Sequence, residues 1–179
     1  MNRRDRLWLQ AVLEEYESKL LRYAADLVGP ALAQDVVQDT FLKLAKQGRG
    51  EIEHLGPWLY RVCRNQALDL RRKVTRLRPL EDDDAASLRD GAAGPAEHLE
   101  RSQTRDSVRR AMGELSDLDR ELVRLKFDGS MSYRQIAELT GLSVSNVGYR
   151  LHHAIRQVRE AMQSAQRAQL ASAREGGSR

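Results

Sequence analysis

The segment from Ser143 to Met162 carries the residue types that could do chemistry in this chain. Its sequence is SVSNVGYRLHHAIRQVREAM. Apolar residues recur every three or four positions, which predicts a helix with one buried stripe. The opposite face gathers hydroxyl, amide, imidazole and guanidinium groups, from Ser145, Asn146, Tyr149, His152, His153 and Arg156. Such side chains can bond to the base edges of DNA, and Arg can also reach phosphates.

A shorter predicted helix precedes this segment. Ser132 and Gln135 have the spacing of a capping box, in which each residue satisfies a free backbone donor at the helix start. Gly141 supplies a turn, because Gly takes a left-handed conformation at little cost, and Ser143 then caps the second helix. The pair predicts a helix-turn-helix whose second helix enters the major groove. Two residues at the start of the first helix are placed to bind phosphate, Tyr133 and Arg134.

The second helix has two other interpretations. Taken alone, its polar face is equally typical of an ordinary solvated surface, and only the capped first helix and the Gly turn favour DNA binding. A metal site at His152 and His153 is disfavoured, because adjacent side chains diverge on a helix and no third ligand is near in the sequence. We therefore expect neither a metal nor a cofactor.

A second polar face is predicted on a helix that begins near Pro57 and runs to about Lys73. It combines an aromatic residue with cations and an amide, from Trp58, Arg61, Arg64, Asn65, Arg71 and Arg72. An aromatic ring among arginines suits unpaired bases, since the ring stacks and the cations follow the backbone. The alternative is that Trp58 belongs to the core.

An acidic face is predicted on an earlier helix, from roughly Leu32 to Lys46. Asp35, Gln38 and Asp39 share this face because their spacing is three and four residues. Carboxylates repel phosphate, so we expect the face to contact a protein rather than DNA. A plain solvated face is the equally plausible alternative.

Composition limits the classes of protein to which this chain can belong. The chain has 179 residues, of which 31% are charged and 41% hydrophobic, with a net charge of +4. The single Cys63 excludes an intrachain disulfide. We expect no membrane insertion and a cytoplasmic location, because no apolar run approaches the roughly 20 residues that span a bilayer.

Periodicity predicts an all-α fold, since helical spacing is common and strand patterns are almost absent. We expect two small helical domains, over residues 1–78 and 105–164. Between them, residues 79–104 read as a flexible acidic linker without a periodic apolar face. The last segment, residues 165–179, is predicted to be a disordered tail.

The order of these pieces resembles a known family. The motifs QDVVQDTFLKLAKQ and WLYRVCRNQALDLRRK resemble region two of the sigma-70-type initiation factors. The stretch LSDLDRELVRLKFDGSMSYRQIAELTGLSVSNVGYRLHHAIRQVR resembles region four. Two such regions joined directly by a short linker are similar to the extracytoplasmic-function (ECF) group, and the resemblance covers roughly residues 10–163.

The resemblance implies a sigma factor without enzymatic activity, which binds core RNA polymerase and promoter DNA. Asp35, Gln38 and Asp39 would dock on the clamp helices of the largest polymerase subunit, and the flap of the second largest subunit is a further contact. Region two would melt and capture the downstream element, with a base flipped into a pocket formed by the loop GRGEIEHLGP. Region four would read the upstream element through Tyr149, His152 and His153, with Arg150 nearer the DNA backbone. An anti-sigma factor is an expected partner.

The sequence departs from the family pattern at three places. Gly148 stands where a basic or hydroxyl residue is common, His152-His153 stand where aromatic or basic residues are common, and Ala45–Gln47 lack an aromatic residue. These departures affect which promoter sequence the chain is expected to recognise, but not the family that it resembles.

Three other functions compete with that of a sigma factor. An autonomous helix-turn-helix regulator would need a dimerising surface, and no heptad pattern supplies one. A metal-dependent nuclease or phosphatase built on Asp82, Asp83 and Asp84 would need those carboxylates held in a fixed geometry, which a flexible linker does not provide. A protein-binding adaptor would not need cations clustered on two separate helices.

Overall fold

The structure is a computed structural model that describes residues 3–77 and 99–176. Within these ranges it contains seven helices and no strand, which confirms the predicted all-α fold. In the same ranges no helix is both long and apolar enough to cross a membrane. The contacts divide the chain into two compact units. The first contains the three N-terminal helices together with Arg124–Gln135, and the second contains the remaining described residues.

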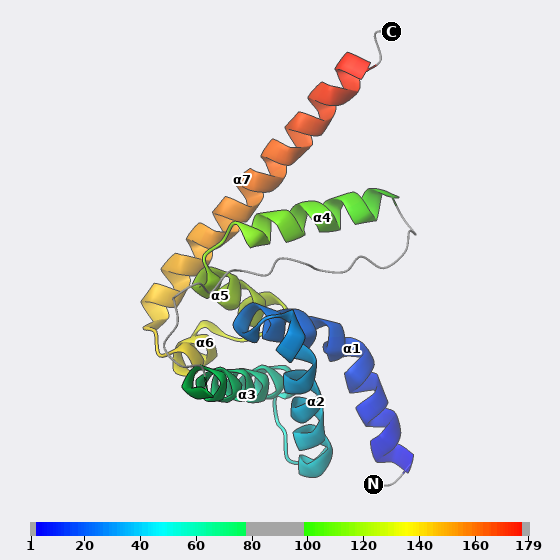
Figure 1. The fold of residues 1–179 in the computed structure, drawn as a ribbon, viewed down its shortest axis with the longest axis vertical. Coiled ribbons are helices and arrows are strands. Elements are labelled where there is room, and N and C mark those ends of the chain that lie inside the picture. The colour runs from blue at the N-terminus through cyan, green and yellow to red at the C-terminus, as the bar shows by residue number, and fades with distance from the viewer. Residues whose placement is uncertain (1–2, 78–98, 177–179) are drawn as a thin grey trace. The chain divides into compact units, whose positions relative to one another are not determined.

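Three helices form the body of the first unit and pack on one another (Figure 1). They are α1 (Arg3–Val28), α2 (Pro30–Gln47) and α3 (Leu55–Leu77). The predicted inward residues of α2 are buried, since Val37, Phe41 and Leu44 are at most 8% exposed. Between α1 and α2 the chain turns at Gly29, whose φ of 83° favours glycine.

Aromatic packing fixes the centre of this unit. The rings of Tyr23 and Tyr60 lie 5.0 Å apart between α1 and α3, and both side chains are fully buried. Burial raises the pKa of Tyr60, and nearby Asp128 adds to the effect. Within the described residues the Tyr60 hydroxyl has no hydrogen-bond partner. Gly129 packs against this ring, and a side chain there would lie 3.1 Å from it.

The second unit is built around the packing of α4 (Leu99–Gly113) on α7 (Val144–Gly176) (Figure 1). Two short helices lie between them in sequence, α5 (Asp117–Phe127) and α6 (Tyr133–Thr140). The last turn of α4 is closed by Arg120, whose guanidinium donates to the carbonyl oxygens of Met112, Gly113 and Leu115.

Two boundaries differ from the sequence expectation. Helix α4 begins at Leu99, inside the range predicted as linker, while most of the predicted acidic linker lies outside the described residues. Helix α7 continues to Gly176, where a disordered tail was predicted from residue 165. The reason is local propensity, because residues 165–175 are rich in Ala, Gln, Arg and Leu and contain neither Gly nor Pro.

Candidate nucleic-acid interface

The helix-turn-helix formed by α6 and α7 has the capping hydrogen bonds and the turn that the sequence predicts. The backbone N–H of Gln135 donates to Ser132 Oγ at 3.2 Å, and Gln135 Oε1 accepts from the N–H of Ser132 at 2.8 Å. This reciprocal pair is the capping box read from the sequence. At the next helix, the N–H of Asn146 donates to Ser143 Oγ at 3.2 Å. Gly141 has a φ of 78°, so the turn takes the left-handed conformation that was expected.

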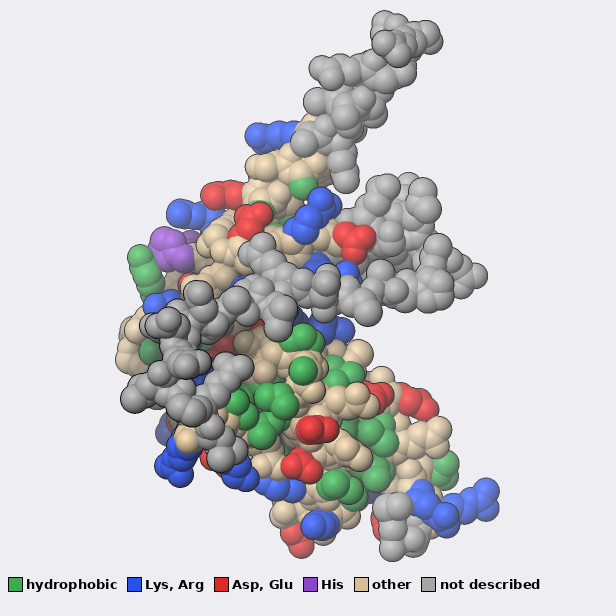
Figure 2. All heavy atoms as spheres, viewed as in Figure 1, with side chains coloured by type: hydrophobic (Ala, Val, Ile, Leu, Met, Phe, Trp, Pro, Cys, Tyr) green, Lys and Arg blue, Asp and Glu red, His purple; other side chains and the backbone are tan. Residues whose placement is uncertain are grey.

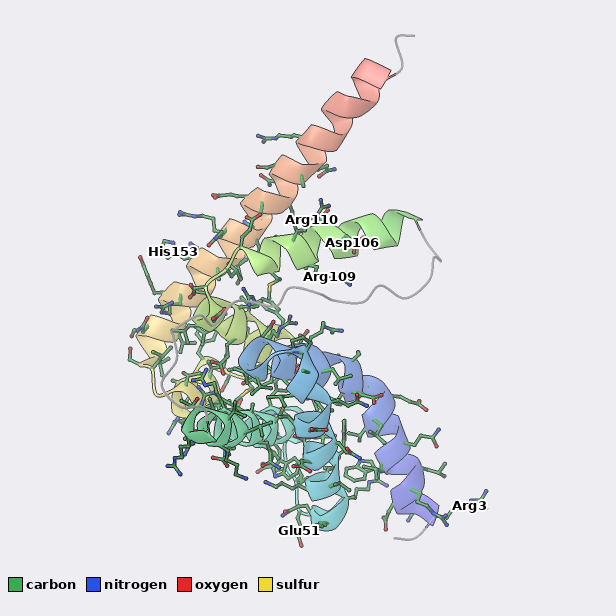
Figure 3. The ribbon with its side chains drawn as sticks, in the orientation of Figure 1. Arg3, Glu51, Asp106, Arg109, Arg110 and His153 are labelled. Atoms are coloured by element: carbon green, nitrogen blue, oxygen red, sulfur yellow. The ribbon has the colours of Figure 1, made fainter. Side chains whose placement is uncertain are left out.

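Helix α7 presents its polar face as the apolar spacing predicts. Val147, Leu151 and Ala154 are at most 3% exposed and form the buried stripe. Tyr149 lies opposite them and is 66% exposed. The His side chains of this helix reach the surface (Figure 2), and His153 lies on the side of α7 away from α4 (Figure 3). The exposed members of the predicted set are Ser145, Asn146, Tyr149, His152 and Arg156.

Three rings on this face are in contact. The rings of Tyr149 and His153 lie 4.3 Å apart at an interplanar angle of 53°. His152 and His153 meet edge to face, with centroids 6.0 Å apart. Tyr149 and His153 are one helical turn apart, which is the spacing at which side chains meet on a helix. The three residues predicted to read bases therefore form a joined aromatic surface.

Arg150 has a different environment from its neighbours. Its guanidinium donates to Asp119 Oδ1 at 2.7 Å, so it ties α7 to the start of α5. Asp119 is itself held by Ser116, whose Oγ accepts from the Asp119 N–H at 3.1 Å and donates to Asp119 Oδ2 at 2.6 Å. Asp119 is not among the site residues predicted from the sequence. The Ser-x-x-Asp spacing from Ser116 is a cap signal that could have drawn attention to it.

Two other residues of this region that are predicted to contact DNA, Arg156 and Tyr133, interact with nearby charged side chains. Arg156 forms an ion pair with Glu160 at 3.7 Å on the exposed surface of α7. At the start of α6, Tyr133 and Arg134 are exposed, and the ammonium group of Lys126 lies 5.3 Å from the centroid of the Tyr133 ring. A cation beside an exposed ring at a helix N-terminus favours the binding of a phosphate group.

The polar face of α3 is largely open to solvent. Figure 2 shows Lys and Arg side chains gathered beside this helix. Its exposed predicted residues are Arg61, Asn65, Arg71 and Arg72, and Arg72 also pairs with Asp69 at 3.3 Å. Trp58 and Arg64 are half-buried. Trp58 therefore lies at the edge of the core. This environment is intermediate between the two predicted alternatives, an exposed platform for base stacking and a core side chain.

The acidic face of α2 is exposed throughout. Asp35, Gln38 and Asp39 are all exposed, while Val36 and Val37 between them are buried. Leu42 continues the same face one turn later and is 53% exposed. Leu42 is not among the site residues predicted from the sequence, although its spacing of three residues from Asp39 places it on this face. An exposed leucine beside carboxylates suits a protein surface better than DNA.

The described residues contain no group of three or more His, Cys, Asp or Glu side chains that could hold a metal ion. Asp82, Asp83 and Asp84 lie outside the described residues. Cys63 is a free thiol in the core, and its burial raises its pKa to about 12.

Two family models match the chain. Residues 12–77 match "Sigma-70 region 2", and residues 105–158 match "Sigma-70, region 4". The first match covers most of α1 and all of α2 and α3, and the second covers the residues from α4 to the middle of α7.

Relatives and solved structures agree with these matches. The chain is 30% identical to the ECF RNA polymerase sigma factor SigL of Mycobacterium tuberculosis over 159 residues, which cover 87% of this chain and 89% of that protein. It is also 30% identical to the ECF sigma factor SigM of Bacillus subtilis, over 64% of this chain and 70% of that one. Its fold is similar to the sigma factor RpoE of Bartonella quintana, solved with the anti-sigma factor NepR. The TM-score is 0.61 at 24% identity, covering 86% of this chain and 96% of that one.

Proposed function

Because the chain belongs to the ECF group of sigma-70-type RNA polymerase sigma factors, its function is promoter-specific transcription initiation, and we propose how its surfaces divide that work. The observation that carries the proposal is the relationship to SigL along almost the whole length of both chains. Region two and region four occur in the same chain and in the expected order.

The polar face of α7 is proposed to read the upstream promoter element. Its support is the capped turn that precedes it and the exposed aromatic surface of Tyr149, His152 and His153. In a helix-turn-helix, residues in the N-terminal part of the second helix reach the base edges. Arg150 is proposed to act chiefly as a positioning residue, because its guanidinium already binds Asp119.

The polar face of α3 is proposed to hold the melted downstream element. Arg61, Asn65 and Arg71 are exposed along the helix and can follow a single strand. Trp58 presents part of its ring at the surface, where a base can stack. The loop between α2 and α3 is proposed to select the flipped base.

The acidic face of α2 is proposed to dock on core RNA polymerase. Asp35, Gln38 and Asp39 supply hydrogen-bond acceptors and charge, and Leu42 adds an apolar contact. This combination suits a basic partner surface with an apolar centre, such as the clamp helices of the largest subunit. The flap of the second largest subunit is the proposed partner of region four.

Sigma factors are generally not enzymes, and we propose that this chain has no catalytic activity of its own. It would act in the cytoplasm, where core polymerase and the promoter are. An anti-sigma factor is the proposed regulator, supported by family membership.

Run-off transcription tests the proposal. The purified chain is mixed with core polymerase and fragmented genomic DNA, and the 5′ ends of the transcripts are sequenced. We expect starts that require the chain and that share two spaced upstream elements. If core polymerase gains no starts while the chain still shifts DNA, an autonomous regulator replaces the sigma-factor proposal and the docking role of α2 is wrong.

A further inference from the structure

The start of α5 lies beside α7 and is joined to it by one close ion pair (Figure 1). In this pair the Arg150 guanidinium donates to Asp119 Oδ1 at 2.7 Å. Along α7, Arg150 lies one turn after Asn146 and one turn before His153, so it shares a side of the helix with both. Asp119 therefore places a carboxylate beside a surface that is proposed to approach DNA.

The Asp119 carboxylate is also held by the cap of its own helix. Asp119 is in the first turn of α5, and Ser116 Oγ accepts from its backbone N–H at 3.1 Å. The Ser116 hydroxyl donates to the other carboxylate oxygen, Asp119 Oδ2, at 2.6 Å. A negative charge in the first turn is further stabilised by the helix dipole. The carboxylate is thus fixed in place, with one oxygen bound to the cap and the other bound to Arg150.

The pair of Arg150 with Asp119 differs from a second ion pair on α7, between Arg156 and Glu160. The side chains of Arg150 and Asp119 are 34% and 24% exposed, and the paired atoms lie 2.7 Å apart. Those of Arg156 and Glu160 are 58% and 67% exposed, and the paired atoms lie 3.7 Å apart. Exposed pairs contribute little, whereas partly buried pairs are screened much less by salt. A DNA phosphate can therefore displace Glu160 from Arg156 more readily than Asp119 from Arg150.

A phosphate and a carboxylate compete for the same guanidinium. Arginine binds either anion through charge-assisted hydrogen bonds. If a phosphate replaced Asp119, the carboxylate would lose its cation and would lie beside a second anion, so the exchange would bring little net gain. While the pair is intact its two charges cancel, and Arg150 adds little to the sequence-independent attraction between cations and DNA phosphates.

We propose that Asp119 holds Arg150 away from DNA phosphates and thereby lowers the sequence-independent affinity of region four for DNA. A larger share of the binding then comes from contacts to base edges, which carry the sequence information. Asp119 influences DNA binding in this way without contacting DNA. This role rests on the proposed function, since it concerns how the upstream element is bound, and it is given to a residue outside the helix-turn-helix.

The salt dependence of DNA binding tests this role. The full chain is combined with core polymerase and titrated against a labelled duplex that contains the upstream element, but not the downstream element, of a promoter found by run-off transcription. A duplex of scrambled sequence is titrated in parallel. Fluorescence anisotropy gives the dissociation constants at about 50 and 200 mM salt, and the salt dependence is the factor by which affinity falls between these concentrations.

The informative variant is Asp119→Asn, which removes the charge but keeps an oxygen that can accept from Ser116 and Arg150. We expect it to bind both duplexes more tightly than the wild-type chain at low salt. Its salt dependence should be about 3.5 times that of the wild-type chain, which is the effect of one additional phosphate contact over this range. A folding defect cannot produce this result, because a misfolded chain would not bind DNA more tightly.

Two further variants assign the effect to Arg150. Adding Arg150→Ala to Asp119→Asn should return the salt dependence to the wild-type value, because the released guanidinium is then absent. Asp117→Asn is the matched control, since it removes the same charge two residues away. The Asp117 side chain is 91% exposed and pairs with Arg120 rather than Arg150. Asp117→Asn should change the salt dependence much less than Asp119→Asn.

The outcomes separate this role from the proposed function. If Asp119→Asn binds no more tightly than the wild-type chain, or keeps its salt dependence, while initiation still requires the chain, the role given to Asp119 is wrong and the proposed function stands. If Asp117→Asn has the same effect as Asp119→Asn, net charge explains the change and the role of Asp119 is equally wrong. If the chain supports no initiation with core polymerase, the proposed function fails and the role of Asp119 fails with it.

Discussion

At the scale of single residues, the proposed DNA-reading face of α7 consists of side chains that contact one another rather than a row of separate ones. Tyr149 and His153 are in ring contact, and His152 meets His153 edge to face. We therefore expect a base that contacts one ring to be affected by the orientation of the next ring. Residues that touch in this way give non-additive effects on mutation.

We predict such coupling between Tyr149 and His153. Each single change to Ala should weaken binding to the upstream element by roughly 5- to 100-fold, the range of one base contact. The double variant should lose less than the product of the two, because removing either ring already disturbs the other. Binding of holoenzyme to upstream-element DNA measures this. Arg159→Ala, an exposed position further along α7, is the control. Fully multiplicative losses would contradict the coupling.

The buried thiol gives a second prediction at this scale. Cys63 is fully buried, and burial raises its pKa from 9.0 to about 12. The folded chain should therefore resist alkylation at pH 8 and react once denaturant unfolds it, since the thiolate is the nucleophile. The unfolded thiol ionises first as pH rises, so the free energy of unfolding should fall between pH 9 and 12.

Mass spectrometry of iodoacetamide-treated chain measures the alkylation, and denaturant unfolding at several pH values measures the stability. Cys63→Ala should show no labelling and a shallower loss of stability above pH 9. Rapid labelling of the folded chain would contradict the burial of this side chain.

At the scale of elements, the position and orientation of α7 depend both on capping residues close in sequence and on tertiary packing. The capping residues Ser132 and Ser143 and the turn at Gly141 fix where the helices begin and end. They do not fix the rotation of α7 about its own axis. That rotation is set by the buried stripe and by the bond between Arg150 and Asp119.

The turn can be tested with two glycines that differ in backbone conformation. A side chain on either Gly141 or Gly50 would meet no atom within 4 Å, but only Gly141 has a positive φ, of 78°. Gly141→Ala should therefore lower the free energy of unfolding by about 1–2 kcal/mol. Gly50→Ala should change it little or raise it slightly. Chemical denaturation measures both. Equal effects of the two substitutions would contradict the role given to the left-handed turn.

At the scale of the whole molecule, the chain separates surfaces of different charge onto different helices. Within the first unit, α3 carries exposed Arg residues while α2 carries Asp35, Gln38 and Asp39. Because carboxylates repel phosphate, we expect the α2 face to contact a protein rather than DNA. The proposed division of labour therefore rests on charge sign as well as on shape.

We predict that reversing charge on α2 disrupts binding to core polymerase. Asp39→Lys should weaken that binding at least tenfold, because an acceptor becomes a repelling cation at a proposed contact with a basic surface. Glu17→Lys makes the same charge change on the exposed surface of α1 and should have a much smaller effect. Competition with the wild-type chain for core polymerase measures both. Equal losses from the two variants would assign the effect to net charge rather than to the α2 face.

The sequence alone determined the features that depend on neighbours along the chain. Helical spacing, the capping box at Ser132, the turn at Gly141 and the polar face of α7 were all predicted, because each follows from residues within a few positions of one another. The end of α7 was placed too early. The terminal Gly-Gly-Ser-Arg indicated a frayed end, whereas residues 165–175 before it have high helix propensity.

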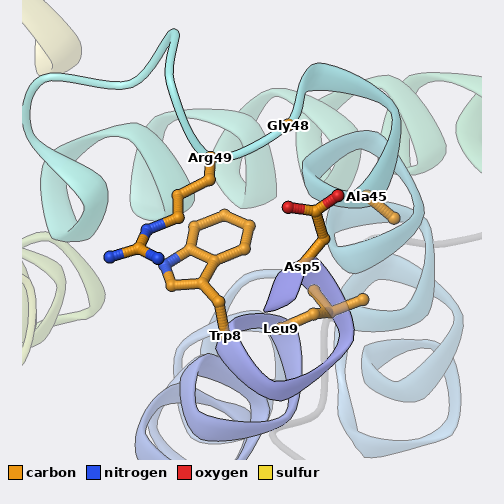
Figure 4. Close-up of a pocket in the computed structure, with 6 residues that line it drawn as sticks. All are labelled: Asp5, Trp8, Leu9, Ala45, Gly48 and Arg49. Carbon is orange, nitrogen blue, oxygen red and sulfur yellow. The ribbon is translucent and has the colours of Figure 1, made fainter. Parts of the chain in front are cut away.

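Tertiary structure decided what depends on residues far apart in sequence. Nothing near Arg150 in the chain indicates that Asp119 holds it, since 31 residues separate the two. Trp8 and Arg49 likewise line one cavity, between the start of α1 and the end of α2 (Figure 4), only because these helices pack together and Gly48 turns the chain. Periodicity gives the face on which a side chain lies, but the partner opposite that face is set by how the helices pack.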